Sequence, residues 1–166
     1  MLEGVIVKPL KRFVDERGSF TEILRTDWKD IVKDEIVQAN LSITYPNIVR
    51  AWHRHERGQV DYMIVVKGAL KICTYDDESK ELDEIISTAE NLQIVRIPGR
   101  YWHGFKAFGT EPAILIYFTN RLYDYNNPDE ARRPWNDPTI IPVKINGRSD
   151  DPRCNKPWDW FTPPHK

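Results

Sequence analysis

Three histidines and one aspartate have types and spacing that could support acid–base or metal chemistry. His53 and His55 are separated by a single residue, so a strand would present both imidazoles on one face. Asp61 follows six residues after His55, and a Pro-Gly turn at residues 98–99 precedes His103. Three imidazoles and a carboxylate suit Zn, Fe, Ni, Co or Mn. The same four side chains could instead form a hydrogen-bonded cluster at the mouth of a barrel.

The elements that would position these side chains are mostly short strands. Apolar and β-branched residues, punctuated by Gly and Pro, predict strands over residues 5–7, 19–24, 37–45, 60–66, 70–75, 92–97 and 113–119. Regular short strands of this kind favour a sandwich or a small barrel. A single short helix is expected over residues 26–33, capped by Thr26 or Asp27.

The composition excludes several classes of protein. The chain has 166 residues, a formal net charge of −1 and 40% hydrophobic residues, which fits one folded domain and argues against a general nucleic-acid binder. Its two cysteines indicate neither a disulfide framework nor a zinc finger. No apolar run reaches the roughly 20 residues of a membrane-spanning helix, and the first residues lack the pattern of a signal peptide. We therefore expect a soluble, cytoplasmic protein that binds neither nucleic acid nor a membrane.

The character of the chain changes after residue 119. The following residues combine Trp, Tyr and Phe with Asn, Asp and Pro, whereas a linker would lack aromatic residues. We favour a segment 121–166 that wraps the domain and buries its rings over a tail that recognises a partner. On this view residues 1–166 form a single domain with a core over about residues 4–120.

The histidine pattern resembles the two-part signature of the cupin superfamily over about residues 47–118. In that signature a His-x-His pair, a carboxylate, a Gly turn and a later Pro-Gly-x-x-x-His line a small β-barrel. Gly68 matches the turn. The chain departs from the pattern at Asp61, which replaces the usual Glu after a slightly longer gap.

More of the chain resembles the dTDP-4-dehydrorhamnose 3,5-epimerases, which are themselves cupins. The order and spacing of their motifs hold from about residue 4 to 140. The matching segments are residues 13–22 (FVDERGSFTE), 38–42 (QANLS), 49–53 (VRAWH), 97–98 with 103–105 (IP and HGF), and 117–119 with Tyr123 and 135–138 (YFT and WNDP).

The resemblance implies an all-β cupin fold, a double-stranded β-helix or jelly-roll barrel, in a homodimer that exchanges or shares its N-terminal strands. It also implies an isomerase that epimerises a dTDP-linked 4-keto-6-deoxyhexose for deoxysugar or polysaccharide biosynthesis, without a cofactor. His53 matches the base that forms an enolate, and Tyr117 matches the acid on the opposite ring face. Asp150 or Asp151 would orient the base, and Asp137 is the less favoured choice.

The substrate-binding residues carry over from the same motifs. Arg17, Phe20 and Glu22 resemble residues that hold the nucleotide, often across a dimer. Gln38 and Asn40 resemble contacts to the base and the sugar. Arg50 resembles a contact near the diphosphate or the sugar. His103 belongs to the third motif, and Tyr123 resembles a residue that closes over the sugar.

The pattern breaks at Asp61, where the family normally has a Lys that steadies the enolate. A unit charge about 4 Å away is worth about 4 kcal/mol at an effective dielectric constant near 20, so the reversal would disfavour the enolate by about 8 kcal/mol. A divalent metal bound by His53, His55, Asp61 and His103 could replace the Lys. Alternatively, Asp61 pairs with His55 or Arg54 and never faces the enolate.

A third alternative is a different sugar, or binding without chemistry. His55 stands where the family usually has Gln, and residues 75–77 (Tyr-Asp-Asp) replace a basic substrate-binding segment. A metal-dependent cupin that acts on a small molecule, and a nucleotide-sugar-binding cupin without turnover, are therefore the competing functions.

Overall fold

The computed structural model describes residues 1–164 of the chain. The strands in this part are β1 (Ile6–Pro9), β2 (Arg12–Asp15), β3 (Gly18–Thr21), β4 (Gln38–Thr44), β5 (Val49–Arg54), β6 (Val60–Lys67), β7 (Ala69–Tyr75), β8 (Glu81–Thr88), β9 (Gln93–Pro98), β10 (Trp102–Phe108), β11 (Ala113–Thr119), β12 (Ala131–Arg132) and β13 (Lys144–Ile145). The predicted all-β class is confirmed.

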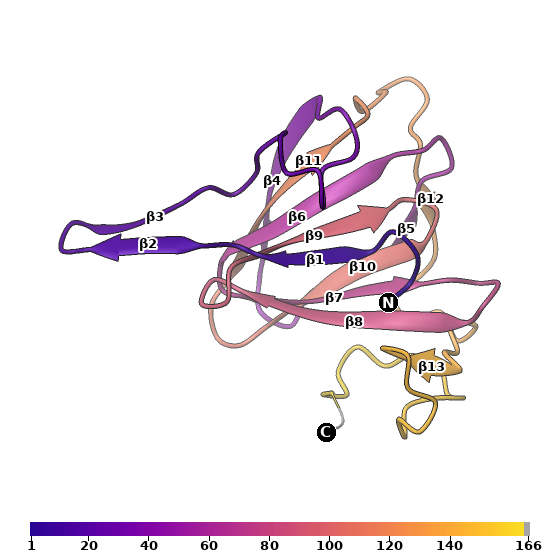
Figure 1. Cartoon of the computed structure of the whole chain (residues 1–166). Helices are drawn as coiled ribbons and strands as arrows, with labels where there is room; N and C mark the ends of the chain where they lie inside the picture. Colours follow the sequence, from indigo (N-terminus) through magenta and orange to yellow (C-terminus); the bar gives the residue numbers. More distant parts are fainter. Residues whose placement is uncertain (165–166) are drawn as a thin grey trace.

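Two sheets face each other and form the barrel (Figure 1). One has the order β1-β9-β6-β11-β4 and the other the order β12-β5-β10-β7-β8-β13. The hairpin β2–β3 belongs to neither sheet and projects away from the barrel as an arm. Within the described residues, no helix is long and apolar enough to cross a membrane.

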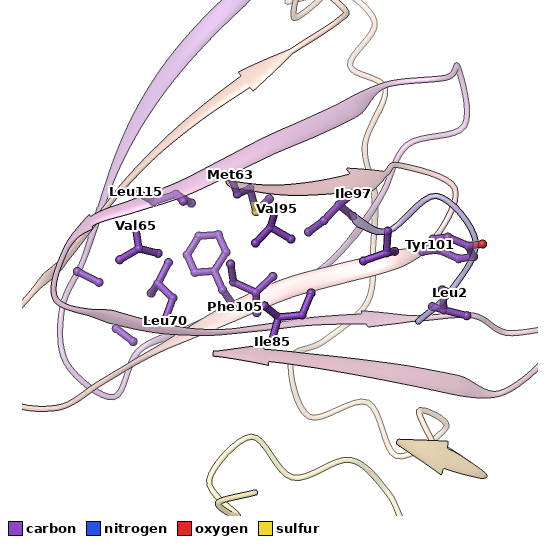
Figure 2. Packing of buried hydrophobic residues seen from close by; sticks show 14 residues of the cluster. Leu2, Met63, Val65, Leu70, Ile85, Val95, Ile97, Tyr101, Phe105 and Leu115 are labelled. Carbon is purple, nitrogen blue, oxygen red and sulfur yellow. The ribbon is translucent and has the colours of Figure 1, made fainter. Parts of the chain in front are cut away.

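The interior of the barrel is filled by side chains that alternate along the strands. Met63 and Val65 of β6 point inward, whereas Tyr62 and Ile64, which alternate with them along the strand, point to the outer face. Figure 2 shows the inner cluster between the two sheets. All four side chains are buried, because segments outside the sheets cover the outer faces as well. This double burial explains why residues 62–66 of β6 form an uninterrupted apolar run.

The short helix predicted over residues 26–33 is wrong. This segment forms successive turns, in which the Val32 amide donates to the Trp28 carbonyl and the Ile31 amide donates to the same carbonyl. Eight residues are too few to repay helix nucleation, and the adjacent β-branched Ile31 and Val32 weaken the helix further. Both side chains are buried against the outer face of β6 and β9, so packing rather than helical periodicity fixes the segment.

The C-terminal segment covers the outer face of the six-stranded sheet. Trp158 and Trp160 are buried there, and the rings of Trp160 and Trp52 of β5 are 4.8 Å apart. The Lys71 ammonium of β7 donates to the carbonyls of Trp160 and Thr162. The tail is therefore joined to the sheet by both apolar and polar contacts.

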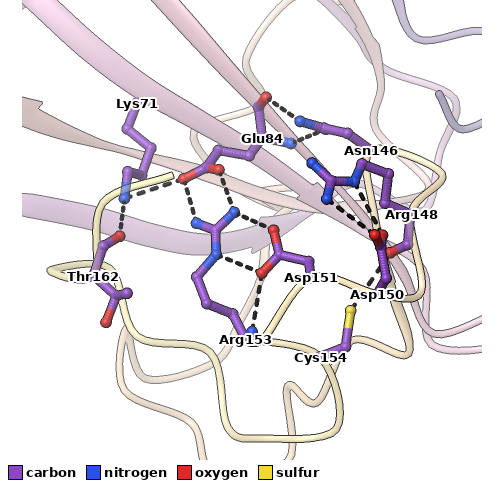
Figure 3. A network of polar contacts seen from close by, with 9 residues as sticks. All are labelled: Lys71, Glu84, Asn146, Arg148, Asp150, Asp151, Arg153, Cys154 and Thr162. Carbon is purple, nitrogen blue, oxygen red and sulfur yellow. Dashed lines mark hydrogen bonds and ion pairs between the residues drawn. The ribbon is translucent and has the colours of Figure 1, made fainter. Parts of the chain in front are cut away.

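A buried group of charges lies under this tail (Figure 3). Arg153 pairs with Asp151 at 2.9 Å and with Glu84 of β8 at 2.9 Å, and Lys71 pairs with Glu84 at 3.1 Å. The two carboxylates thus face two cations, which is the condition under which buried charges are tolerated. The more exposed Asp150 pairs with Arg148 at 3.0 Å.

Candidate active site

A cavity of about 800 Å³ opens at one end of the barrel. Its walls are the inward-facing side chains of β4, β6 and β11 from one sheet and of β5 and β10 from the other. Met63, Phe105 and Leu115 belong to both the apolar core and the cavity lining, so they form its floor. The polar site therefore lies directly above the packed core.

Strand register brings the predicted histidines together. His103 of β10 lies opposite His53 of β5, and a register irregularity follows between His103 and Phe105. A side chain at Gly104 would meet the backbone of Ala51 and the carbonyl of Arg50 at 2.7 Å, so only glycine allows β10 to approach β5 here. The two imidazole rings lie 6.4 Å apart.

Asp61 and His103 form a buried pair. His103 Nε2 lies 3.3 Å from Asp61 Oδ2, and both side chains are only 4% exposed. Burial opposes a negative charge on Asp61, but the hydrogen bond and charge of His103 outweigh it, and the pKa of Asp61 is lowered. Burial likewise opposes a positive His103, but Asp61 outweighs it and the pKa of His103 is raised. His103 Nδ1 donates to the Tyr101 carbonyl at 2.9 Å, so both ring nitrogens act as donors.

Gln59 connects this pair to His55. The Gln59 amide nitrogen lies 2.8 Å from Asp61 Oδ1 and 3.2 Å from His55 Nε2, so its two hydrogens serve both partners. His55 Nδ1 in turn donates to the Asp129 carbonyl. A continuous chain of hydrogen bonds thus runs from Asp129 through His55 and Gln59 to Asp61. Of the two predicted partners of Asp61, His55 lies 3.9 Å away, while Arg54 pairs with Glu56 and Asp77 instead.

His53 is half-buried and faces a carboxylate that the sequence did not single out. Its Nε2 lies 3.8 Å from Glu130 Oε1. Burial and then the nearby charge of His103 lower the pKa of His53 to about 4, which Glu130 counteracts only in part. At neutral pH His53 is therefore uncharged, the form in which an imidazole can accept a proton.

Tyr117 of β11 also lines the cavity. Burial, followed by the charges of Asp61 and Glu130, raises the pKa of its hydroxyl. Tyr117 consequently keeps its proton at neutral pH, as a proton donor must.

Polar and basic side chains surround the cavity above this level. Gln38 and Asn40 are hydrogen-bonded to each other, and the Tyr123 amide donates to Gln38. Arg50 donates to Ser42. The arginines among the lining residues are Arg50, Arg57, Arg121 and Arg132. Their side chains could hold anionic oxygens, which guanidinium groups bind in pairs.

The structure brings nine predicted residues to one cavity and leaves five others outside it. Those that line it are Gln38, Asn40, Arg50, His53, His55, Asp61, His103 and Tyr117, joined by Tyr123 at the mouth. Arg17, Phe20 and Glu22 lie in or next to the β2–β3 arm, outside this lining. Arg17 pairs with Asp15 at 2.6 Å and Glu22 with Arg25 at 2.8 Å.

The structure places Asp150 and Asp151, one of which was predicted to orient His53, outside the cavity lining. Both belong to the C-terminal charge group (Figure 3), where Arg148 and Arg153 engage them. Asp137 accepts hydrogen bonds from Thr139 and is likewise absent from the cavity lining. The tail is held on the outer face of the sheet, whereas His53 faces the interior.

Several lining residues were missed by sequence reasoning. They are Arg57, Gln59, Arg121, Asp124, Tyr125, Asp129, Glu130 and Arg132. Most belong to a loop over residues 120–130, which carries no periodic pattern. Gln59 offered one signal, since it lies two residues from Asp61 and would share its face on an extended strand.

Three of the four predicted metal ligands converge. One ligand atom each from His55, Asp61 and His103 lies within 4.8 Å of the others, and His53 is outside this group. The Nδ1 atoms of His55 and His103 both bond to backbone carbonyls, an arrangement common behind metal-binding imidazoles. The Gln59 amide, however, already joins His55 to Asp61.

The chain is similar to proteins of known kind. It matches the family described as the polysaccharide biosynthesis C-terminal domain over residues 13–131. It is 42% identical over 139 residues to a Haloferax volcanii protein named "Probable low-salt glycan biosynthesis epimerase Agl13", which covers 81% of this chain and 88% of that protein. It is 36% identical over 145 residues to the spore coat polysaccharide biosynthesis protein SpsL of Bacillus subtilis, covering 84% and 94%.

A solved structure extends the similarity to three dimensions. The dTDP-4-dehydrorhamnose 3,5-epimerase from Sulfolobus tokodaii has a TM-score of 0.70 and 27% identity, over 80% of this chain and 78% of that one. This likeness confirms the predicted jelly-roll fold and the predicted resemblance to these epimerases.

Proposed function

Because the chain belongs to the family of the polysaccharide biosynthesis C-terminal domain, we propose that it epimerises a nucleotide-linked 4-keto-6-deoxyhexose for glycan biosynthesis. One relative is named a probable glycan biosynthesis epimerase, and one relative of solved structure is named a dTDP-4-dehydrorhamnose 3,5-epimerase. The observation that carries the proposal is the placement of an uncharged His53 and a protonated Tyr117 in one cavity of about 800 Å³. The enzyme is an isomerase of the cupin fold.

The two side chains supply the proton transfers that epimerisation needs. The 4-keto group acidifies the adjacent C–H bonds, so His53 can take a proton while the bonding electrons move to the keto oxygen as an enolate. Tyr117 then gives its proton to the opposite face of that carbon, which inverts the centre and restores the ketone. Exchange with solvent returns a proton to Tyr117 and removes one from His53.

The pairing of Asp61 with His103 reduces the repulsion that a carboxylate at this position would exert on the enolate. The carboxylate lies 3.3 Å from His103 and raises the pKa of that imidazole, and a protonated His103 would leave the pair with almost no net charge toward an enolate. The enolate penalty of about 8 kcal/mol assumed a lone carboxylate facing the substrate, and it does not apply to a neutralised pair. The arginines at the mouth would bind the diphosphate.

The substrate-binding roles of Arg17, Phe20 and Glu22 are proposed to operate in a homodimer. Phe13 and Phe20 on the arm are 48% and 65% exposed, and Leu41 on the edge strand β4 is 64% exposed. An arm that packs on a second copy would bury this apolar surface. The arm of one subunit would then reach the partner's cavity.

Sedimentation velocity tests the homodimer. The double variant Phe13→Ser/Phe20→Ser is expected to be monomeric at concentrations where the wild type is dimeric. Ile86→Ser is a matched control, since Ile86 is 38% exposed on β8 of the other sheet. A wild-type protein that sediments as a monomer contradicts the dimer.

Deuterium incorporation tests the epimerase. The protein is incubated in D₂O with a dTDP-4-keto-6-deoxyhexose, and NMR and mass spectrometry follow C3 and C5. Deuterium is expected at one or both centres, and His53→Ala is expected to abolish it. Glu56→Gln serves as the control, because Glu56 lies outside the cavity lining. If the wild type incorporates no deuterium above the rate without enzyme, the proposal is wrong.

A metal-dependent cupin is the second candidate, and the convergence of His55, Asp61 and His103 within 4.8 Å favours it. Zn, Fe, Ni or Mn could take these three ligands if His103 lost its Nε2 proton, and would polarise the keto oxygen. His53 would remain available as the base. Elemental analysis of the purified protein decides: a stoichiometric metal lost in His55→Ala supports this candidate, and a metal-free active enzyme eliminates it.

A further inference from the structure

The carboxylate nearest the proposed base comes from an unexpected part of the chain. We propose that Glu130 is the positioning residue of His53: it accepts the Nε2 proton of His53 and leaves Nδ1 as the atom that takes the substrate proton. The inference rests on the proposed epimerase function. It replaces the tail aspartates Asp150 and Asp151, which Arg148 and Arg153 engage elsewhere.

A short strand fixes Glu130 beside His53. β12 pairs antiparallel with β5, with Arg132 opposite His53 and Ala131 opposite Arg54. Two reciprocal backbone hydrogen bonds between Trp52 and Arg133 extend this pairing. Glu130 lies two residues before Arg132, so on an extended strand the two side chains share a face. Glu130 thus lies diagonally across from His53, within reach of a long side chain.

The two carboxylate oxygens of Glu130 have different partners. Arg132 donates to Oε2 at 2.6 Å, while Oε1 lies 3.8 Å from His53 Nε2. Arg132 therefore limits the rotation of the carboxylate and directs Oε1 to the imidazole. A separation of 3.8 Å is long for a hydrogen bond, and catalytic hydrogen bonds often shorten when substrate binds.

The charge of Glu130 acts on every proposed proton-transfer group of the site. After burial and the charge of Asp61, it contributes to the raised pKa of Tyr117, and it opposes the lowering of the pKa of His53. Both the His53 and Glu130 side chains are shielded, with 26% and 21% exposure.

The proton balance is complete with these groups. A C–H bond beside the ketone breaks, its proton goes to His53 Nδ1, and its electrons move to the keto oxygen. The imidazolium that results carries its second proton on Nε2 against the Glu130 carboxylate, which stabilises the positive charge as it develops. Solvent later removes the Nδ1 proton.

Variant kinetics test this role. Glu130→Gln is expected to lower kcat for deuterium incorporation about a hundredfold or more, as expected for impaired general-base catalysis, while KM changes by less than about threefold. Glu130→Asp keeps the charge on a shorter side chain and is expected to recover at least a tenth of the wild-type kcat. Glu56→Gln makes the same substitution at an exposed carboxylate and is expected to match the wild type.

The tautomer of His53 gives a second readout that needs no turnover. In protein labelled with ¹⁵N-histidine at pH 7.5, His53 is expected to carry its proton on Nε2, and Glu130→Ala is expected to mix the two tautomers. A wild-type His53 protonated on Nδ1, or a Glu130→Gln enzyme with wild-type kcat, overturns the inference alone. Absence of exchange in the wild type overturns the proposed function, and the catalytic role of Glu130 with it.

Discussion

Replacing Asp61 by Asn removes the negative charge from the buried pair with His103 and changes little in shape. At 3.3 Å and an effective dielectric constant near 20, the attraction between the two charges is about 5 kcal/mol. The variant leaves His103 buried without its counter-charge, and breaking one side of such a pair costs about 3–5 kcal/mol. We expect the free energy of unfolding at pH 6.5 to fall by that amount.

The pH dependence should reverse its sign. Because the folded-state pKa of His103 is raised, its stabilisation is complete below the unfolded value of about 6.5 and is lost as pH rises through the folded value. Wild-type stability should therefore fall above pH 6.5, by at most about 1.4 kcal/mol per pH unit. In Asp61→Asn the hydrogen bond and charge of Asp61 are lost, so burial is expected to outweigh the smaller opposing effects of the Tyr101 carbonyl and Glu130 and to lower the pKa of His103. Stability should then rise as pH increases toward 6.5 and level off above it.

Urea unfolding at 25 °C between pH 5.5 and 8, with EDTA present, measures both effects. In this range His53 is uncharged in the folded state, and the buried Cys73, whose pKa is raised well above its usual value, stays protonated. Asp150→Asn is the control, since its 75% exposed side chain forms a surface ion pair worth at most about 1 kcal/mol. An Asp61→Asn protein with wild-type stability and slope would refute the ionised pair.

Three further outcomes follow from the described contacts. Asp151→Asn should lower the free energy of unfolding by about 3 kcal/mol, because the two buried cations Lys71 and Arg153 would then face only one carboxylate, Glu84. Its kcat should be unchanged in assays below its melting temperature. Tyr117→Phe should reduce inversion about 10²–10⁴-fold, while deuterium exchange of the proton taken by His53 continues, as NMR of recovered substrate would reveal. Trp160→Ala should cost about 3–5 kcal/mol in calorimetric or urea unfolding, because the ring is 0% exposed.

The sequence predicted the walls of the cavity well, for a physical reason. Strand alternation assigns side chains to faces, so His53 on one strand and His103 after a Pro-Gly turn were expected on the same interior. The observed strands 60–67, 69–75 and 113–119 differ from the predicted ranges by at most one residue at either end. These are the segments in which apolar burial on both faces leaves little choice of register.

The remaining residues depend on contacts that no local pattern contains. Glu130 reaches His53 only because the two-residue β12 pairs with β5, across more than 70 positions of sequence. Asp151 was expected near His53 only from the resemblance, and its pair with Arg153, which also binds Glu84, holds it in the C-terminal segment. A helix was predicted over residues 26–33 from a local capping signal. The packing of this segment against β6 and β9 is a long-range contact that the local sequence does not indicate.

Two of the departures from the epimerase pattern, at Asp61 and at His55, are linked in the structure. Gln59 donates one amide hydrogen to each of them, so the three side chains act as a unit. An ammonium in place of Asp61 would face the positive His103 at close range and would leave Gln59 with an unused donor. The carboxylate is therefore held by the two imidazoles and the amide around it, and it favours the charged form of His103. In such a site the developing enolate would face the Asp61–His103 pair and the donors of the cavity wall rather than a single lysine. The proposed base His53 depends on Glu130, and the same loop supplies Asp129 to His55.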